Sequence, residues 1–579
     1  MPKPTLLGAA GMALALLTLP ASAAVQGQNE DVVQLPSGRV HGSTRDGVRT
    51  FFGLPYAAPP VGERRWRPPA APVAWQGIRS ARHFGPACPQ SRETETQLAV
   101  REAFSEDCLY LNVWAPAALA PGASAPVMVW LHGGGFIAGA GSDAVFDGRG
   151  LARRGVILVS LNYRLGRLGF FAHPALGQAT ANFALLDQLA ALRWVQDHIA
   201  AFGGDPHNVT LFGESAGGIA ALALLASPAA EGLFNRLIVQ SGAILRPMRR
   251  LRQSASGNED GGEDRDELPS AEALGLAFAA AQGLSGSDSG VAQALRNLPL
   301  DAVAPAHPSY EAVMEIAVTT APSLDDTVLP EHPLAYLRAL PPAKRPPILL
   351  GSNTLEAQVW QFALERPSLL PLLEVPSRGV AGAAVSALLA LGYRDENPDE
   401  KTDETPGQKP GENAGAAAPR DLLASDLFLG AGTLHLAALW AHDGADTNAN
   451  KSTNAATANA YLYRFNAVPE ALRGYAAGAP HGMELFYVFE SLAQFPGLGD
   501  EVPARDAALA STVADYWAGF AHNGRSGGPG LPDWPAFDAS QPRLMAFEND
   551  GAALAPVPRI GVLRWLWRLM AWTGVAGPS

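Results

Sequence analysis

The sequence predicts a doubly wound α/β fold with a large, mostly parallel sheet. Short apolar runs rich in β-branched residues recur along the chain, and they do not alternate with polar residues. Such runs are typical of strands buried on both faces of a parallel sheet. Longer stretches with helical character separate the runs, and this alternation indicates the doubly wound arrangement. With 579 residues, 47% of them hydrophobic, the chain has enough apolar material for a large core.

Six runs are predicted to be strands and two stretches are predicted to be helices. The strands are PVMVWL (126–131), VILVSLNY (156–163), VTLF (209–212), LIVQSG (237–242), PPILLGS (346–352) and AYLYRF (460–465). The helices are FALLDQLAALRWVQDHIAAF (183–202) and AGGIAALALLA (216–226). Because the sequence has no internal repeat, we expect one domain over residues 30–555.

Three polar stretches interrupt this domain, at residues 254–267, 396–419 and 445–460. They are rich in Gly, Pro, Asn and acidic residues and contain no aromatic side chain. Such a composition cannot bury enough surface to order itself, so we expect flexible insertions. The acidic runs could be read as calcium loops, but their carboxylates lack a regular ligand spacing. We therefore expect no metal and no cofactor.

Residues 1–23 have the pattern of a secretory signal peptide. Lys3 precedes an apolar run from Leu6 to Leu19, and small residues stand at Ala21 and Ala23. The apolar run is short for a membrane span, and no cysteine near the cleavage point offers a site for a lipid. We expect a protein that is exported to the periplasm or secreted.

Cys88 and Cys108 are the only two cysteines of the chain. In an oxidising compartment the simplest interpretation is one disulfide that closes a short loop. Loop-closure entropy makes such a bridge worth roughly 3 kcal/mol. Two buried thiols are the alternative.

Ser215 lies in the segment VTLFGESAGG (209–218) and matches the pattern G-x-S-x-G. The pattern alone is weak evidence, since the chain contains 60 glycines. Its position is more informative, because it falls where a predicted strand ends and an Ala-rich helix begins. There a tight turn exposes the serine Oγ at the carboxyl edge of the sheet, and Gly213 and Gly217 avoid crowding the turn. We interpret Ser215 as a nucleophile.

The run LHGGGF (131–136) follows another predicted strand. Consecutive glycines let backbone N–H groups converge on an oxyanion, and the N–H of Ala216 would complete the set. A simple glycine-rich connector is the alternative.

A nucleophilic serine also needs a base and an acid that orients the base. Both are expected after later strands, in the order Ser, acid, His. Glu356 follows the predicted strand at 346–352, and His481 precedes an apolar run. Among the 12 histidines, His207 and His522 stand in polar stretches, and His198 lies on a predicted helix. From the residues alone, His481 is either the base or a structural histidine.

Seven segments resemble the type-B carboxylesterases, the group that includes cholinesterases and bacterial p-nitrobenzyl-type esterases. They are FFGLPYAAPPVGERRWRPP (51–69), SEDCLYLNVWAP (105–116), VMVWLHGGGFIAG (127–139), VSLNYRLGRLGFF (159–171), DQLAALRWVQDHIAAFGGDPHNVTLFGESAGG (187–218), LIVQSGA (237–243) and HGMELFYVF (481–489). EDCLYLNVW and the extended serine segment are highly specific to that family. The resemblance covers roughly residues 30–555. It implies an α/β-hydrolase fold, a twisted sheet flanked by helices, and hydrolysis of small-molecule carboxylic esters.

The resemblance also assigns the catalytic residues. Ser215 matches the acylated serine, His481 in H-G-x-E matches the general base, and Glu356 aligns with the acid. The acid segment of the family commonly reads D-E-G, whereas Leu355 and Ala357 flank the glutamate here. Glu356 is therefore the member of the triad that departs most from the family pattern.

Gly134, Gly135 and Ala216 match the oxyanion donors of the family, and Cys88 and Cys108 match its first disulfide. The loop between the cysteines contains no Trp. Cholinesterases use a Trp there to hold a quaternary ammonium, so we do not expect choline esters as substrates.

Other functions use the same scaffold. An amidase, thioesterase or lactonase would carry the same triad. A non-catalytic binding module typically lacks the serine or the histidine, and both are present here. A true lipase would carry a long amphipathic lid, and no insertion is apolar enough to form one.

The C-terminal tail (560–579) is rich in Trp. Its run RWLWRLMAW (564–572) places Trp565, Leu569 and Trp572 on one helical face. Such a helix could lie on a membrane surface, but we favour a helix packed back on the domain. The net charge of −13 argues against a nucleic-acid partner, because phosphate binding needs basic patches.

Overall fold

The computed structural model describes residues 31–91, 102–119, 122–243, 247–253, 268–357, 419–441, 459–495, 498–499 and 501–572. The predicted signal peptide lies outside the described residues, as do nearly all residues of the three predicted insertions. Pro419 and Ala460, the last residues of two of these stretches, belong to a helix and a strand.

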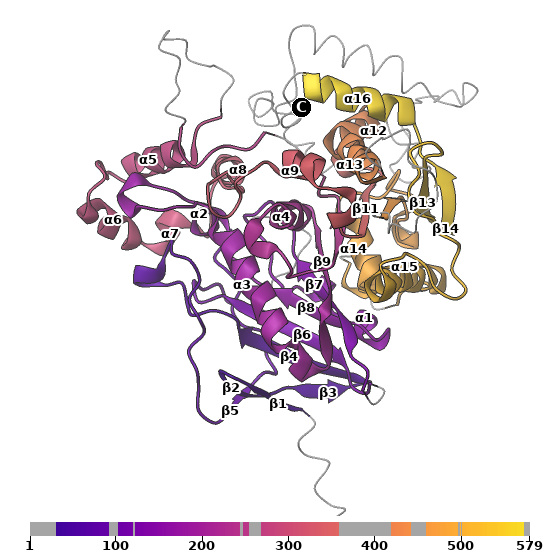
Figure 1. Ribbon diagram of the computed structural model, residues 1–579, viewed down its shortest axis with the longest axis horizontal. Helices are drawn as coiled ribbons and strands as arrows, with labels where there is room; N and C mark the ends of the chain where they lie inside the picture. Colours follow the sequence, from indigo (N-terminus) through magenta and orange to yellow (C-terminus); the bar gives the residue numbers. More distant parts are fainter. Residues whose placement is uncertain are drawn as a thin grey trace, which may run out of the picture.

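An eleven-stranded sheet forms the centre of the described part of the chain, with the order β14-β13-β12-β11-β10-β9-β7-β8-β6-β4-β3 (Figure 1). The strands are β3 (Ser43–Arg45), β4 (Val48–Pro55), β6 (Tyr110–Pro116), β7 (Ala125–Leu131), β8 (Ile157–Leu161), β9 (Gly204–Glu214), β10 (Arg236–Gln240), β11 (Ile348–Asn353), β12 (Ala460–Phe465), β13 (Arg543–Glu548) and β14 (Gly551–Pro556). Neighbours from β8 to β13 pair in parallel, and the outer pairs are antiparallel. A smaller sheet joins β1 (Val32–Leu35), β2 (Gly38–His41) and β5 (Ile78–Ser80). All six predicted strands are confirmed, and they form the parallel centre.

Helices cover both faces of the large sheet. One face carries α1 (Arg149–Arg153), α14 (Met483–Val488) and α15 (Ala504–Asn523). The other carries α3 (Phe183–His198), α4 (Ala216–Leu225), α9 (Pro333–Ala339), α12 (Pro419–Ser425), α13 (Ala431–Ala441) and α16 (Ile560–Trp572). Within β7, Val127 and Val129 belong to one buried cluster while Met128 and Trp130 belong to the other. Burial on both faces explains why the central strands are continuously apolar.

A group of short helices lies to one side of the sheet, at the left of Figure 1. It contains α2 (Gly166–Gly169), α5 (Ala271–Ala281), α6 (Ser289–Arg296) and α7 (Leu300–Val303). The helix α8 (Tyr310–Thr319) leads from this group back toward the centre.

The C-terminal helix α16 packs against α13, as we favoured from the sequence. Leu563, Leu566 and Trp567 are buried in this contact, and the Trp567 ring stacks on His435 with ring centroids 4.1 Å apart. Trp565, on the opposite side, is 39% exposed. The buried face of α16 is therefore not the face that the sequence pattern singled out.

The predicted disulfide between Cys88 and Cys108 is present, and both residues are buried. It joins the segment that follows β5 to the segment that leads into β6. One described helical stretch, Asp421–Ala441, is long and apolar enough to cross a membrane by length and composition, but most of it is buried in the core.

Candidate active site

Ser215 occupies a sharp turn between β9 and α4. Its backbone has φ 52° and ψ −121°, a conformation that is rare for a residue with a side chain. A Cβ atom on Gly217 would lie 2.0 Å from the carbonyl oxygen of Leu131, so only glycine fits there. A Cβ atom on Gly213 would lie 2.5 Å from the backbone of Gly217. The turn is thus built from close backbone approaches that require both glycines of the motif.

The glycine run after β7 lies directly beside Ser215. A Cβ atom on Gly133 would be 3.3 Å from the Cβ of Ser215. Gly134 and Gly135 have φ values of +99° and +62°, which turn successive backbone N–H groups in a way that other residues rarely allow. Ala216 is the first residue of α4, where backbone N–H groups have no partner within the helix. The predicted oxyanion donors therefore come from two elements that meet at the serine.

Glu356 and His481 contact each other, as the sequence analysis expected. His481 Nδ1 lies 2.5 Å from Glu356 Oε2. The Glu356 carboxylate is buried, and its Oε1 accepts a hydrogen bond of 2.6 Å from Ser241 Oγ and one of 2.5 Å from the backbone N–H of Asn353. Ser241 follows β10 directly and Asn353 ends β11, so the carboxyl edge of the parallel sheet assembles this contact.

The other ring nitrogen of His481 faces a second carboxylate. His481 Nε2 lies 3.0 Å from Oε1 of Glu214, the residue before the serine. Among the described residues, no hydrogen bond joins Ser215 Oγ to His481. Burial alone would lower the pKa of His481, but Glu214 and Glu356 outweigh burial and raise that pKa well above its usual value. The two carboxylates therefore favour the protonated form of the imidazole that lies between them.

A third carboxylate, Glu484, completes the cluster. Glu484 Oε1 accepts a hydrogen bond of 3.2 Å from Gln240 Nε2, and its Oε2 accepts one of 2.5 Å from Asn353 Nδ2. Burial raises the pKa of Glu484 to about 8, and the charges of Glu214 and Glu356 act in the same direction. Glu484 is thus protonated at neutral pH, which reduces the repulsion among three neighbouring carboxyl groups.

His132 is the second histidine next to the glycine run. It is fully buried, its ring stacks on Tyr163 with centroids 4.3 Å apart, and its Nδ1 lies 2.9 Å from the carbonyl oxygen of Gly133. Burial lowers the pKa of His132 to about 4. His132 is therefore neutral, directly after β7, whereas His481 contacts Glu214, the residue before Ser215.

The sequence analysis singled out Ser215, Glu356 and His481 but missed Glu214, Glu484 and Ser241. All three stood in quoted segments: Glu214 in G-E-S-A-G, Glu484 as the Glu of H-G-x-E, and Ser241 in LIVQSGA (237–243). Within the part of the chain that the structure describes, no group of three or more His, Cys, Asp or Glu side chains is arranged to hold a metal ion. The cluster is a hydrogen-bonded acid–base network.

The sequence is similar to two curated esterases. It is 45% identical to a fumonisin B1 esterase of Sphingopyxis macrogoltabida over 274 residues, which cover 46% of this chain and 50% of that protein. It is 50% identical to a para-nitrobenzyl esterase of Bacillus subtilis (strain 168) over 218 residues, which cover 37% of this chain and 44% of that protein. These two alignments span about half the length of each relative.

The fold is similar to that of a solved PNB esterase. That structure matches with a TM-score of 0.72 and 29% sequence identity, over 95% of this chain and all of the other. The model of the carboxylesterase family matches residues 29–557. This chain therefore belongs to the carboxylesterase family and has the α/β-hydrolase fold that its sequence predicted.

Proposed function

We propose that this chain is a serine carboxylic-ester hydrolase in which Ser215, His481 and Glu356 form the catalytic triad. One observation carries the proposal: the imidazole of His481 lies 2.5 Å from the buried carboxylate of Glu356, and its other nitrogen contacts Glu214, which directly precedes the serine of the strained turn. A serine nucleophile, an imidazole and an orienting acid are the three groups that acyl transfer needs.

The reaction runs in two steps. Ser215 Oγ attacks the ester carbonyl while His481 takes its proton, and the imidazolium then protonates the departing alcohol. Water, activated by the same imidazole, hydrolyses the acyl-enzyme. Glu356 accepts the Nδ1–H, which fixes the tautomer in which Nε2 is the base.

In each tetrahedral intermediate the negative charge is on the former carbonyl oxygen of the ester, which lies beside the glycine run in the proposed mechanism. The backbone N–H groups of Gly134, Gly135 and Ala216 are the donors proposed for this oxyanion. The positive φ values at Gly134 and Gly135 support this role, as does the position of Ala216 at the start of α4. Each donor is worth about 3 kcal/mol in the barrier.

His481 must exchange one partner before it can act. In the resting site its Nε2 contacts Glu214, and a proton on Nε2 blocks its use as a base. Deprotonation of the imidazole weakens this ion pair and frees Nε2 to turn toward Ser215, the residue that follows Glu214. Catalytic hydrogen bonds are often loose without substrate and tighten when it binds. The carboxylate of Glu214 thus sets the pH at which the base becomes available.

The proposal is tested with purified Ser215→Ala and a panel of p-nitrophenyl esters from acetate upward, p-nitrobenzyl esters, and amide and thioester analogues. We expect turnover to be lost while the thermal unfolding temperature is kept. Unchanged ester hydrolysis by Ser215→Ala would refute the assignment. Activity on amides or thioesters alone favours the alternative in which the same triad serves another acyl bond. Inactivity of the wild type on every ester favours a binding module.

We further propose that the protein is exported, with residues 1–23 as a signal peptide. The buried Cys88–Cys108 disulfide supports an oxidising compartment. Cell fractionation followed by N-terminal sequencing of the mature protein tests this. An intact Met1 in the cytoplasmic fraction contradicts export.

A further inference from the structure

Asn353 connects the two loops that carry the acid and the base. It is the last residue of β11, and its backbone N–H donates to Glu356 Oε1 at 2.5 Å. Its side chain reaches the other loop, since Nδ2 donates to the carbonyl oxygen of Pro480 at 2.8 Å and to Glu484 Oε2 at 2.5 Å. Pro480 immediately precedes His481. One asparagine thus holds the acid by its backbone and the histidine loop by its amide.

Both donors of the amide are committed to the histidine loop. The Pro480 carbonyl also accepts from the Met483 N–H at 3.1 Å, so the turn through His481 is closed on one side by its own backbone and on the other by Asn353. A single backbone bond, from Leu355 N–H to the Ala479 carbonyl at 2.9 Å, joins the same two loops nearby. Apart from the Glu356–His481 contact itself, the amide is therefore a side-chain link between the two loops that reaches the residue next to the imidazole.

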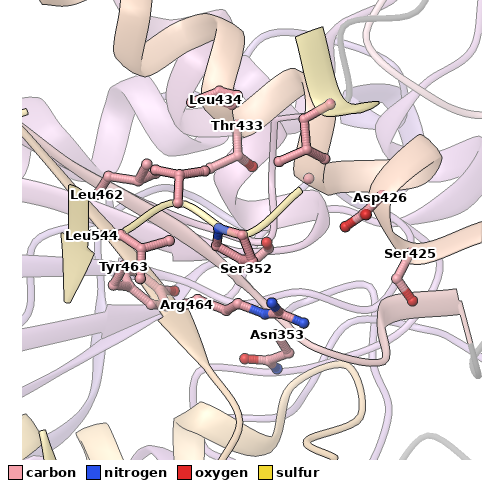
Figure 2. Close-up of a pocket in the computed structure, with 14 residues that line it drawn as sticks. Ser352, Asn353, Ser425, Asp426, Thr433, Leu434, Leu462, Tyr463, Arg464 and Leu544 are labelled. Atoms are coloured by element: carbon pink, nitrogen blue, oxygen red, sulfur yellow. The ribbon is translucent and has the colours of Figure 1, made fainter. Parts of the chain in front are cut away.

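The oxygen of the Asn353 amide, Oδ1, makes no hydrogen bond to the described residues of the catalytic loops. Asn353 is 3% exposed, and its Oδ1 has no hydrogen-bond partner among the described residues. Asn353 lines a small cavity of about 40 Å³ together with Thr433 and Arg464, on the side of the sheet that carries α13 (Figure 2). Thr433 Oγ1 is also buried without a partner in the described part of the chain. The side-chain hydrogen bonds of Asn353 are thus made by its Nδ2 donors, and both go to the loop that carries His481.

We propose that Asn353 is a positioning residue: its carboxamide fixes the histidine loop against the acid loop and so places the imidazole of His481. The proposal rests on the proposed triad. It requires that loss of the amide lowers kcat, because a displaced imidazole weakens proton transfer while the substrate pocket is unchanged. A merely structural role would instead lower stability without a selective effect on kcat.

Three variants test this role. Asn353→Asp keeps the shape but leaves the Pro480 carbonyl facing an oxygen that cannot donate, and it places a second carboxyl group against Glu484. We expect kcat to fall about 100-fold, as for a small misplacement of a catalytic group, with KM within about twofold. Asn353→Ala removes both donors without adding a charge, and its kcat should fall in the same direction. Asn353→Asp combined with Glu484→Gln reverses donor and acceptor across the same contact, and it should recover at least tenfold of the lost kcat.

Thr433→Val is the matched control, because it is nearly isosteric and lines the same cavity, while Thr433 Oγ1 makes no hydrogen bond to either catalytic loop in the described part of the chain. Its kcat should be unchanged. The proposal is overturned if folded Asn353→Ala keeps the wild-type kcat, or if the donor–acceptor reversal recovers nothing. Should Asn353→Asp fail to fold, the kcat of folded Asn353→Ala decides the outcome. Ser215→Ala separates the two hypotheses: if it stays active, the proposed triad fails, and if only the Asn353 variants stay active, the positioning role alone fails.

Discussion

Ser215 is placed by the backbone, whereas His481 is placed by side chains. On the serine side, the turn depends on glycines whose Cβ atoms would overlap backbone atoms of β7 and of the turn itself. On the histidine side, Glu356, Glu214 and the amide of Asn353 hold the ring and its loop through hydrogen bonds and charges. A backbone-built turn is rigid and insensitive to pH, while a network of carboxylates responds to protonation. The two sides should therefore fail in different ways when they are changed.

The largest expected effect is on the histidine side. Glu356→Gln keeps the shape of the acid but removes its charge and permits the wrong imidazole tautomer. We expect kcat to fall about 10,000-fold, as when the acid of a serine triad is replaced by its amide. Steady-state kinetics together with thermal unfolding measures this. Because the substitution is isosteric, the unfolding temperature should change little, and a kcat within tenfold of wild type would contradict the role of Glu356.

The serine side should lose activity and stability together. Gly217→Ala places a Cβ atom 2.0 Å from the Leu131 carbonyl oxygen, so the turn or the end of β7 must shift. Overpacking of this kind costs about 1–3 kcal/mol of unfolding free energy, and the same shift moves Ser215 away from the oxyanion donors. Chemical denaturation and kcat are measured on one preparation. As a control, Gly232→Ala changes a glycine that has positive φ but open space around it, and it should keep full activity.

A pH profile separates the two sides further. In the proposed mechanism His481 is the base and must be neutral, so the acidic limb of kcat/KM should follow its pKa, which Glu214 and Glu356 raise. Glu214→Gln removes one of these charges, lowers the pKa of His481 and should extend activity to lower pH. An acidic limb that stays in place, or moves to higher pH, contradicts the proposed role of Glu214.

The smallest effect on catalysis is expected from the disulfide. Replacing Cys88 and Cys108 together by Ser opens a loop with a sequence separation of 20 residues and should lower the free energy of unfolding by about 3 kcal/mol. Neither cysteine contacts Ser215 or His481, so kcat should stay within about twofold at temperatures where the variant is folded. A large loss of kcat would show that the loop contributes to the site.

The sequence predicted the serine side more completely than the histidine side. A strand, a glycine-flanked serine and a helix are neighbours in the chain, so local pattern contains the whole turn. The residues around His481 are Glu214 from β9, Glu356 from the loop after β11, and Ser241, which follows β10 and bonds Glu356. Their proximity depends on the order of the strands. Ser241 and Asn353 stand at the carboxyl ends of two predicted strands, which is where a parallel sheet gathers functional side chains. That rule could have flagged them, but no motif gave their roles.

The edges of the sheet were also harder to predict than its centre. β13 and β14 form an antiparallel pair at the edge of the sheet that is partly exposed, and their runs RLMAFE and GAALAP contain none of the β-branched residues that identified the inner strands. In α16 the apolar residues surround much of the helix, and only packing against α13 decided which of them are buried.

The positive φ of Ser215 has a consequence for how this enzyme adapts to its substrate. The backbone of the turn holds the Cβ atom of Ser215 in one place, so the hydroxyl adjusts to an ester only by rotation about its own side-chain bond. The larger movement between the resting and the reacting state is that of the His481 ring, whose Nε2 contacts the carboxylate of Glu214 at rest.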